Sequence, residues 1–123
     1  MKPGKSGLAR IVDAANYSMQ GLKACWIHEA AFRQNLALSA VLFFASFPVA
    51  ANPVQWLLLV FPLLLLLIVE LLNSAVESAV DRIGTEHHEL SGRAKDASSA
   101  AVFVCLILIG LCWIAIIWQN FFR

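Results

Sequence analysis

Two long stretches without an ionisable side chain constrain this chain more than any other feature of its sequence. No Asp, Glu, Lys, Arg or His occurs in the 36 residues from Gln34 to Val69 or in the 26 residues from Ala97 to Phe122. About 20 apolar residues suffice for one helical crossing of a bilayer. Because 60% of the 123 residues are hydrophobic and only 14% are charged, a water-soluble domain could not bury the excess. The sequence predicts an all-α integral membrane protein.

The segment before these stretches has a different pattern, because its apolar residues recur every three or four positions. They are Leu8, Ile11, Val12, Ala15, Met19, Leu22 and Trp26, with polar residues between them. This periodicity predicts an amphipathic helix that lies on the membrane surface. A helix that merely packs against its neighbours would show the same periodicity.

The first uncharged stretch is too long for one crossing, and Pro48, Asn52 and Pro53 favour a turn near its middle. The charged, glycine-containing segment before the second stretch reads as a loop. We therefore expect one domain, 1–123, with an amphipathic surface helix over 1–28, transmembrane helices over 29–51, 54–80 and 97–120, and a cytoplasmic loop over 81–96.

The distribution of basic residues sets the expected orientation. Lys and Arg precede the first transmembrane helix and recur at Arg82, Arg93 and Lys95, whereas the turn around Asn52 has none. The positive-inside rule then places the N-terminus and the 81–96 loop in the cytoplasm, with the C-terminus in the periplasm. A formal net charge of +1 excludes the strongly basic surface of a nucleic-acid binder.

Four polar residues along the second transmembrane helix and at the first position after it recur at intervals of three, four and four: Glu70, Asn73, Glu77 and Asp81. This spacing stacks them on one helical face, with Glu77 about 10 Å nearer the cytoplasm than Glu70. Ionisable groups at membrane depth are functional candidates. Glu70, out of water, is suited to accept a proton from an alcohol, whereas Glu77 is placed to stay ionised and bind a cation.

Glu29, at the cytoplasmic start of the first transmembrane helix, is expected at a depth similar to that of Glu77. The two carboxylates would form an oxygen-rich Mg²⁺ site together with phosphate oxygens. A stripe of hydrogen bonds that only holds helices together is the structural alternative.

Several cytoplasmic side chains have the charge or hydrogen-bonding groups that a polyphosphate needs: Arg10, Tyr17, His87, His88, Lys95 and Asp96. The segment Gly4-Lys5-Ser6 has only the end of a P-loop, without the upstream glycine or the strand. The histidines lack the Cys or His spacing of a tetrahedral zinc site. A nucleotide would therefore be bound without a familiar nucleotide-binding fold.

The segment Glu70-Leu-Leu-Asn73-Ser-Ala-Val-Glu77-Ser-Ala-Val-Asp81-Arg82 resembles the signature of the prokaryotic diacylglycerol kinase family. Gly21-Leu22-Lys23, Glu29-Ala-Ala-Phe32-Arg33-Gln34 and His88-Glu-Leu-Ser-Gly-Arg-Ala-Lys95-Asp96 are similar to that family too. The resemblance covers nearly the whole chain. It implies a homotrimeric helical bundle in the inner membrane that uses MgATP to phosphorylate diacylglycerol to phosphatidate, with sites shared between protomers.

The resemblance also implies roles for individual residues. Glu70, Asn73 and Lys95 would be catalytic, with Glu70 as the general base, and Glu29 and Glu77 would bind Mg²⁺. The residues implied to bind ATP are Arg10, Tyr17, Glu29, Glu77, Glu86, His87, His88, Lys95 and Asp96. Those implied to contact the lipid are Arg10, Ala14, Ala15, Tyr17, Ser18, Lys23, Ala31, Glu70, Ser99 and Trp113.

Three other functions remain open from the sequence. The same family also includes undecaprenol kinases, so the resemblance does not determine which lipid is phosphorylated. A small proton-coupled transporter would use a membrane glutamate as well, but it would not need Lys95 and Asp96 beside the cytoplasmic mouth. A purely structural membrane subunit would leave the polar face from Glu70 to Asp81 without a use.

Overall fold

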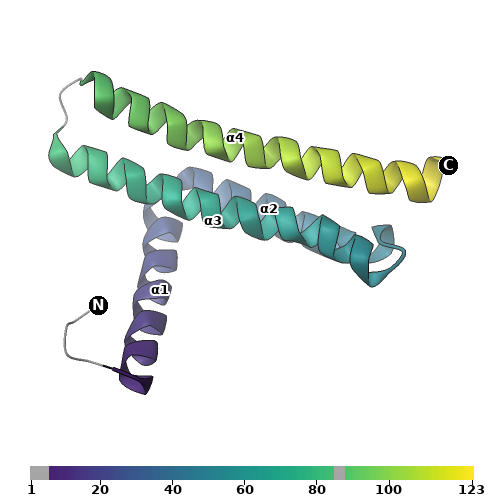
Figure 1. Ribbon diagram of the computed structural model, residues 1–123, viewed down its shortest axis with the longest axis horizontal. Coiled ribbons are helices and arrows are strands. Elements are labelled where there is room, and N and C mark those ends of the chain that lie inside the picture. The colour runs from purple at the N-terminus through teal and green to yellow at the C-terminus, as the bar shows by residue number, and fades with distance from the viewer. Residues whose placement is uncertain (1–5, 85–87) are drawn as a thin grey trace.

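The computed structural model describes residues 6–84 and 88–123 of the chain (Figure 1). Its elements, in chain order, are α1 (Leu8–His28), α2 (Ala30–Val49), α3 (Pro53–Ile83), α4 (Glu89–Ile117) and a short π-helix, η1 (Trp118–Phe122). Every regular element in these residues is helical, which confirms the predicted all-α class.

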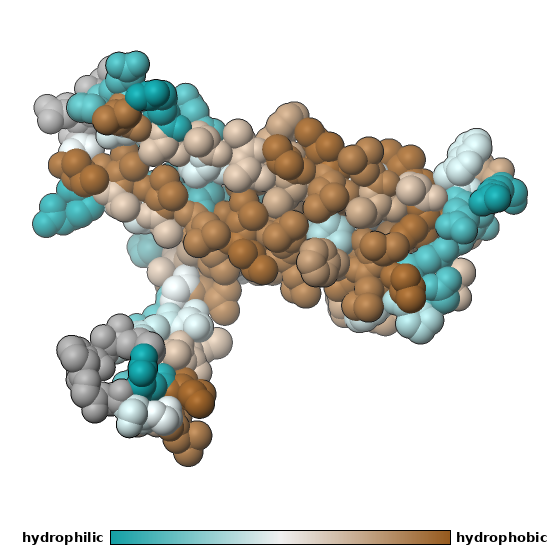
Figure 2. Space-filling view, viewed as in Figure 1, coloured by the Kyte–Doolittle hydropathy of each residue, from teal (hydrophilic) through white to brown (hydrophobic). Residues whose placement is uncertain are grey.

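Helices α2, α3 and α4 lie side by side as an elongated bundle, and α1 leaves it at a steep angle (Figure 1). Three helical segments are long and apolar enough to cross a membrane: Ala30–Val49, which is α2, Pro53–Ile83, which is α3, and Glu89–Phe122, which comprises α4 and η1. Apolar residues cover the middle of the bundle, and hydrophilic residues gather toward its two ends (Figure 2). This distribution is the one expected of a bundle surrounded by lipid.

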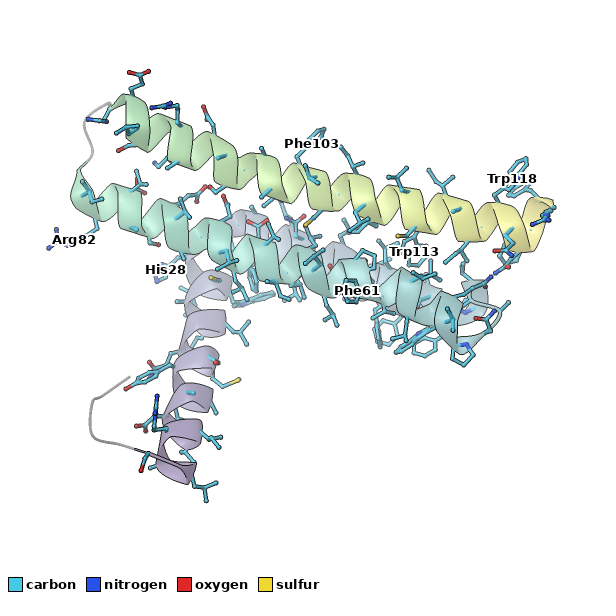
Figure 3. The ribbon with its side chains drawn as sticks, in the orientation of Figure 1. His28, Phe61, Arg82, Phe103, Trp113 and Trp118 are labelled. Atoms are coloured by element: carbon cyan, nitrogen blue, oxygen red, sulfur yellow. The ribbon has the colours of Figure 1, made fainter. Side chains whose placement is uncertain are left out.

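The hydrophobic core lies between α3 and α4. Leu59, Leu63 and Leu66 recur at helical spacing on α3 and pack against a row on α4 that consists of Cys105, Ile109, Trp113 and Ile116. The Trp113 indole Nε1 donates a hydrogen bond to the Leu59 carbonyl oxygen at 3.1 Å. Trp113 lies between the two helices, whereas Trp118 points away from them (Figure 3). A buried Trp normally requires such a partner for its N–H group.

The predicted turn between the first two transmembrane helices is confirmed. Asn52 is the N-cap of α3, and its side-chain Oδ1 accepts a hydrogen bond from the backbone N–H of Gln55 at 2.9 Å. Pro53 occupies the first turn of α3, where the missing N–H has no helical partner to lose. Pro48 lies inside the last turn of α2, so the helix ends just after it, at Val49.

The expected loop over 81–96 is wrong in its extent. Helix α3 continues to Ile83 and α4 begins at Glu89, so only residues 84–88 separate them. The His88 side chain caps α4, because its Nδ1 accepts a hydrogen bond from the backbone N–H of Leu90 at 3.1 Å. No proline interrupts the residues after this cap, and the charged side chains there are compatible with a helix. Lys95 and Asp96 therefore lie on a helix rather than in a loop.

Helix α1 has few contacts with the rest of the chain, and none of its residues from Leu8 to His28 is buried. Its apolar residues are exposed along its length, among them Leu8, Ile11, Val12, Met19 and Trp26. Among the described residues, none buries this apolar face of α1. Its position on a membrane surface stays a prediction.

At the opposite end from the α3–α4 connection, neutral amide side chains join three segments. Asn120 Nδ2 donates to the Val49 carbonyl oxygen and to Gln55 Oε1, both at 2.8 Å. Gln55 Nε2 lies 3.3 Å from Gln119 Oε1 and from Asn120 Oδ1. We call Gln55, Gln119 and Asn120 the amide clasp, which ties η1 to the α2–α3 turn.

Candidate functional site

The polar face predicted for α3 is present, and its deepest member is almost fully enclosed. Glu70 is 2% exposed, and its Oε2 accepts a hydrogen bond from Asn35 Nδ2 at 2.7 Å. Asn73 Nδ2 lies 3.5 Å from Glu70 Oε1 and 3.5 Å from Glu77 Oε1. A buried carboxylate is costly unless it is hydrogen-bonded, and both Glu70 oxygens have a donor here. We call Glu70, Asn73, Glu77 and Asp81 the acidic stripe.

Asn35 makes the shortest hydrogen bond to Glu70 but is not among the residues predicted from the sequence. Asn35 lies on α2, one residue after the start of the first uncharged stretch. An amide at this depth needs a polar partner on another helix. The presence of Asn35 in an uncharged stretch could therefore have predicted a hydrogen bond between helices. The sequence does not say which residue of α3 that partner is.

The acidic stripe becomes more exposed toward the α3–α4 connection. Glu77 is half-buried, and Asp81 is exposed. Asp81 Oδ1 forms an ion pair with Lys95 Nζ of α4 at 2.7 Å, with the Asp81 side chain 61% exposed and that of Lys95 42% exposed. This pair brings one predicted catalytic residue, Lys95, beside the stripe. Asp96, the next residue, is exposed.

Glu29 lies at the break between α1 and α2, where an extended backbone (φ −119°, ψ 105°) interrupts the helix. Its side chain is half-buried and lines a groove of about 590 Å³ between α1 and α3. Figure 3 places His28 at the same junction, where α1 meets the bundle. The groove is lined by Ser18, Gly21, Leu22, Ala24, Cys25, His28, Glu29, Leu71, Ser74, Ala75 and Ser78.

The donor set suits Mg²⁺ only if other ligands complete its shell. In residues 6–84 and 88–123, no group of three or more His, Cys, Asp or Glu side chains is close enough to hold a metal ion. Glu29 and Glu77 offer carboxylate oxygens, and Mg²⁺ is commonly bound by one or two carboxylates plus phosphate oxygens and water. The chemistry of these two carboxylates is compatible with Mg²⁺ that arrives with a polyphosphate, but both the Mg²⁺ site and the pairing of Glu29 with Glu77 stay predictions.

The remaining predicted site residues are dispersed in the single chain. Those on α1 are all exposed: Arg10, Ala14, Ala15, Tyr17, Ser18 and Lys23. Ala31 on α2 and Ser99 on α4 are exposed too. Trp113 is buried in the α3–α4 core, so in this chain its role is packing, and its contact with lipid stays a prediction. Glu86 and His87 lie outside the described residues, and His88 caps α4.

Comparisons with known proteins bear on the whole of this arrangement. A family profile described as "Prokaryotic diacylglycerol kinase" matches residues 16–117. A protein named "Diacylglycerol kinase" from Escherichia coli (strain K12) is 47% identical over 123 residues, which cover 98% of this chain and 99% of that protein. Proteins of the same name from Haemophilus influenzae and Pseudomonas aeruginosa are 45% identical over 108 residues and 46% identical over 114 residues. These two alignments cover 88% and 93% of this chain, and 92% and 93% of the respective relatives.

Proposed function

The chain belongs to the prokaryotic diacylglycerol kinase family, and from that premise we propose that it transfers the γ-phosphoryl group of ATP to a membrane diacylglycerol. The product would be phosphatidate. The observation that best supports this activity is Glu70, a carboxylate enclosed within a membrane-length helix and held by Asn35 and Asn73. A carboxylate kept out of water in this way is suited to take the proton of an alcohol.

In the proposed step, the free hydroxyl oxygen of the lipid attacks the γ-phosphorus of ATP. The hydroxyl proton passes to Glu70, a new oxygen–phosphorus bond forms, and the bond from the γ-phosphorus to the β-γ bridging oxygen breaks, so that ADP leaves. The amide donors Asn35 Nδ2 and Asn73 Nδ2 fix the carboxylate from two sides. Their role is to orient the base before the lipid arrives.

Glu29 and Glu77 would hold Mg²⁺, which when bound neutralises the phosphate charge and orients the γ-phosphoryl group. Asn73 supports this assignment because its amide lies within 3.5 Å of both Glu70 and Glu77. One amide thus spans the proposed base and the proposed metal ligand. Lys95 and Asp96 would bind the phosphates from α4, together with Arg10, Tyr17, Glu86, His87 and His88.

The reaction would take place at the cytoplasmic face of the inner membrane. The support is the exposure gradient of the acidic stripe, from buried Glu70 to exposed Asp81, at the end of the bundle where Arg82 and Arg93 also lie. Basic residues at that end favour a cytoplasmic location. The lipid would contact Ala14, Ala15, Ser18, Lys23, Ala31, Ser99 and Trp113 in addition to Arg10, Tyr17 and Glu70.

The working unit would be a homotrimer whose sites combine neighbouring chains. Asn73 Oδ1 is buried without a hydrogen-bond partner among the described residues, and polar groups at membrane depth require protein neighbours. Mixing Glu70→Gln subunits with Lys95→Ala subunits tests the sharing. Activity should return in mixed trimers if the two residues serve one site from different chains. Mixed trimers that are verified by tag pull-down and remain inactive would place both residues in one chain.

The activity is tested with purified protein in mixed micelles, labelled ATP, and diacylglycerol or undecaprenol supplied separately. We expect label in diacylglycerol. Label in undecaprenol alone would show that undecaprenol, and not diacylglycerol, is the lipid substrate. Label in neither lipid would reject the kinase assignment and favour the transporter.

A further inference from the structure

Ser74 and Ser39 are the two buried helical serines among the described residues whose hydroxyls have no hydrogen-bond partner, and of the two only Ser74 lines the groove between α1 and α3. The hydroxyls of Ser18, Ser46 and Ser98 each donate to a carbonyl oxygen in the preceding helical turn. Ser74 is only 5% exposed, yet its Oγ has no hydrogen-bond partner among the described residues. Burying an unsatisfied hydroxyl is unfavourable, so such a group calls for a partner other than the residues that the structure describes.

The surroundings of Ser74 indicate what that partner is. Ser74 lines the groove of about 590 Å³ between α1 and α3, a volume within the range of small-molecule pockets. Most of the other lining residues are apolar, and Glu29, the proposed metal ligand, lines the same groove. An occupant of this groove would be largely apolar, would have at least one polar group for Ser74, and would lie beside a carboxylate assigned to the phosphate site.

Ser74 also joins the groove to the acidic stripe. It follows Glu70 by four residues, which corresponds to a rise of about 6 Å and a rotation of about 40° around the helix. Leu71, Ala75 and Ser78 continue the groove-lining face of α3, so Ser74 lies on the border between that face and the proposed base. A lipid head group bonded to Ser74 is therefore about one helical turn from Glu70.

We propose that Ser74 positions the lipid substrate. The Ser74 hydroxyl donates a hydrogen bond to an ester carbonyl of a diacylglycerol that is bound in the α1–α3 groove. The contact places the free lipid hydroxyl toward Glu70 and favours a glycerol ester over a polyprenol, which has no ester carbonyl. A serine hydroxyl is a donor that a carbonyl oxygen satisfies without charge. This inference rests on the proposed kinase function and names a selectivity determinant within it.

The test compares two short-chain substrates in mixed micelles. One is 1,2-dioctanoylglycerol, which has two ester carbonyls, and the other is 1,2-di-O-octylglycerol, its diether analogue, which keeps the free hydroxyl but has no carbonyl. Ser74→Ala should raise the KM for the diester about three- to tenfold, the size expected for the loss of one neutral hydrogen bond. The KM for the diether and the KM for MgATP should stay unchanged. The melting temperature should be equal or higher, because the variant removes an unsatisfied buried hydroxyl.

Ser39→Ala is the matched control. Ser39 is also 5% exposed and also has no partner for its hydroxyl among the described residues, but it lines a different, apolar cavity between α2 and α3. Its substitution should leave both lipid KM values unchanged. Ser74→Cys, which keeps the size of the side chain but is a much weaker donor, should repeat the diester defect and covers the case in which Ser74→Ala misfolds.

The outcomes distinguish a failure of the proposed kinase function from a failure of the proposed Ser74 contact. Wild-type protein that phosphorylates neither glycerolipid would overturn the kinase function and the Ser74 contact together. Wild-type activity with equal losses for diester and diether in the Ser74 variants would overturn the contact alone. A lower kcat and melting temperature with an unchanged diester KM would show that Ser74 serves packing, which also overturns the contact.

Discussion

The two ends of the bundle both contain polar side chains at the edge of the apolar band, but they use them differently. In the amide clasp, Gln55 Oε1 accepts hydrogen bonds from the Ala51 N–H and from Asn120 Nδ2, both at 2.8 Å, and its Nε2 also has acceptors. In the acidic stripe, Asn73 Oδ1 is buried without a partner among the described residues. The amides of Gln55 and Asn120 have their hydrogen-bond partners within one chain, whereas Asn73 of the stripe retains an unused acceptor.

The difference in charge reinforces this contrast. The clasp consists of neutral amides, which join η1 to the α2–α3 turn without adding a charge near the apolar band. The stripe consists mainly of carboxylates, whose burial is costly and which are retained where a reaction needs them. We therefore expect substitutions of Glu70 and Glu77 in the stripe to change catalysis or nucleotide binding, and substitutions in the clasp to change stability.

The largest effect should follow Glu70→Gln. The amide keeps the shape of the side chain and can still accept the Asn35 hydrogen bond, but it cannot take the lipid proton, so kcat should fall at least about 100-fold. Single-turnover transfer of labelled phosphate measures this loss. MgATP binding should be largely retained. A variant with more than a tenth of wild-type kcat would contradict the role of Glu70 as the base.

The next effect concerns the proposed metal ligands. Glu29→Gln and Glu77→Gln each remove a charge that would face Mg²⁺, so Mg²⁺-dependent nucleotide affinity should fall by more than about tenfold. Nucleotide titration at several Mg²⁺ concentrations measures it. Glu89→Gln, at the exposed first turn of α4, is the control and should bind nucleotide like the wild type. Equal affinity in the Glu29, Glu70 and Glu77 variants would contradict the division of roles.

The clasp provides the opposite case. Asn120→Ala removes the donor to Val49 and Gln55 and should lower the free energy of unfolding by about 1–3 kcal/mol. Reversible unfolding in detergent measures this change, and kcat per folded protein should be unchanged. Gln119→Ala should cost less, because Gln119 accepts a single hydrogen bond at 3.3 Å. A fall in kcat without a loss of stability in either clasp variant would contradict the difference proposed between the two ends of the bundle.

The smallest effect should come from the exposed end of the stripe. Asp81→Asn removes the ion pair with Lys95, and because both side chains are substantially exposed, the melting temperature should change only slightly. Thermal unfolding at low and high salt measures the change, which should shrink at high salt because salt screens exposed charges. A larger, salt-independent loss would mean that the pair is more enclosed than in the single chain.

Local patterns in the sequence were sufficient for the helices and for the stripe. The uncharged stretches required membrane-length helices, and Asn52 with Pro53 fixed the start of α3. The spacing of Glu70, Asn73 and Glu77 placed them on one face, and the structure links all three through Asn73. These features depend on residues within a few turns of one another, so helical periodicity alone predicts them.

The contacts between helices were decided only by the tertiary structure. Asn35 reaches Glu70 and Asn120 reaches Gln55 because particular faces of different helices meet, and the pattern of one helix does not specify the rotation of its neighbour. The loop was overestimated for a related reason: charge suggested solvent, but a charged segment can be a helix, and His88 supplies the cap that starts α4. Only the tertiary structure distinguishes Ser74 from Ser18, Ser46 and Ser98, whose hydroxyls have hydrogen-bond partners. Whether a hydroxyl has such a partner depends on the atoms around it and not on its position in the sequence.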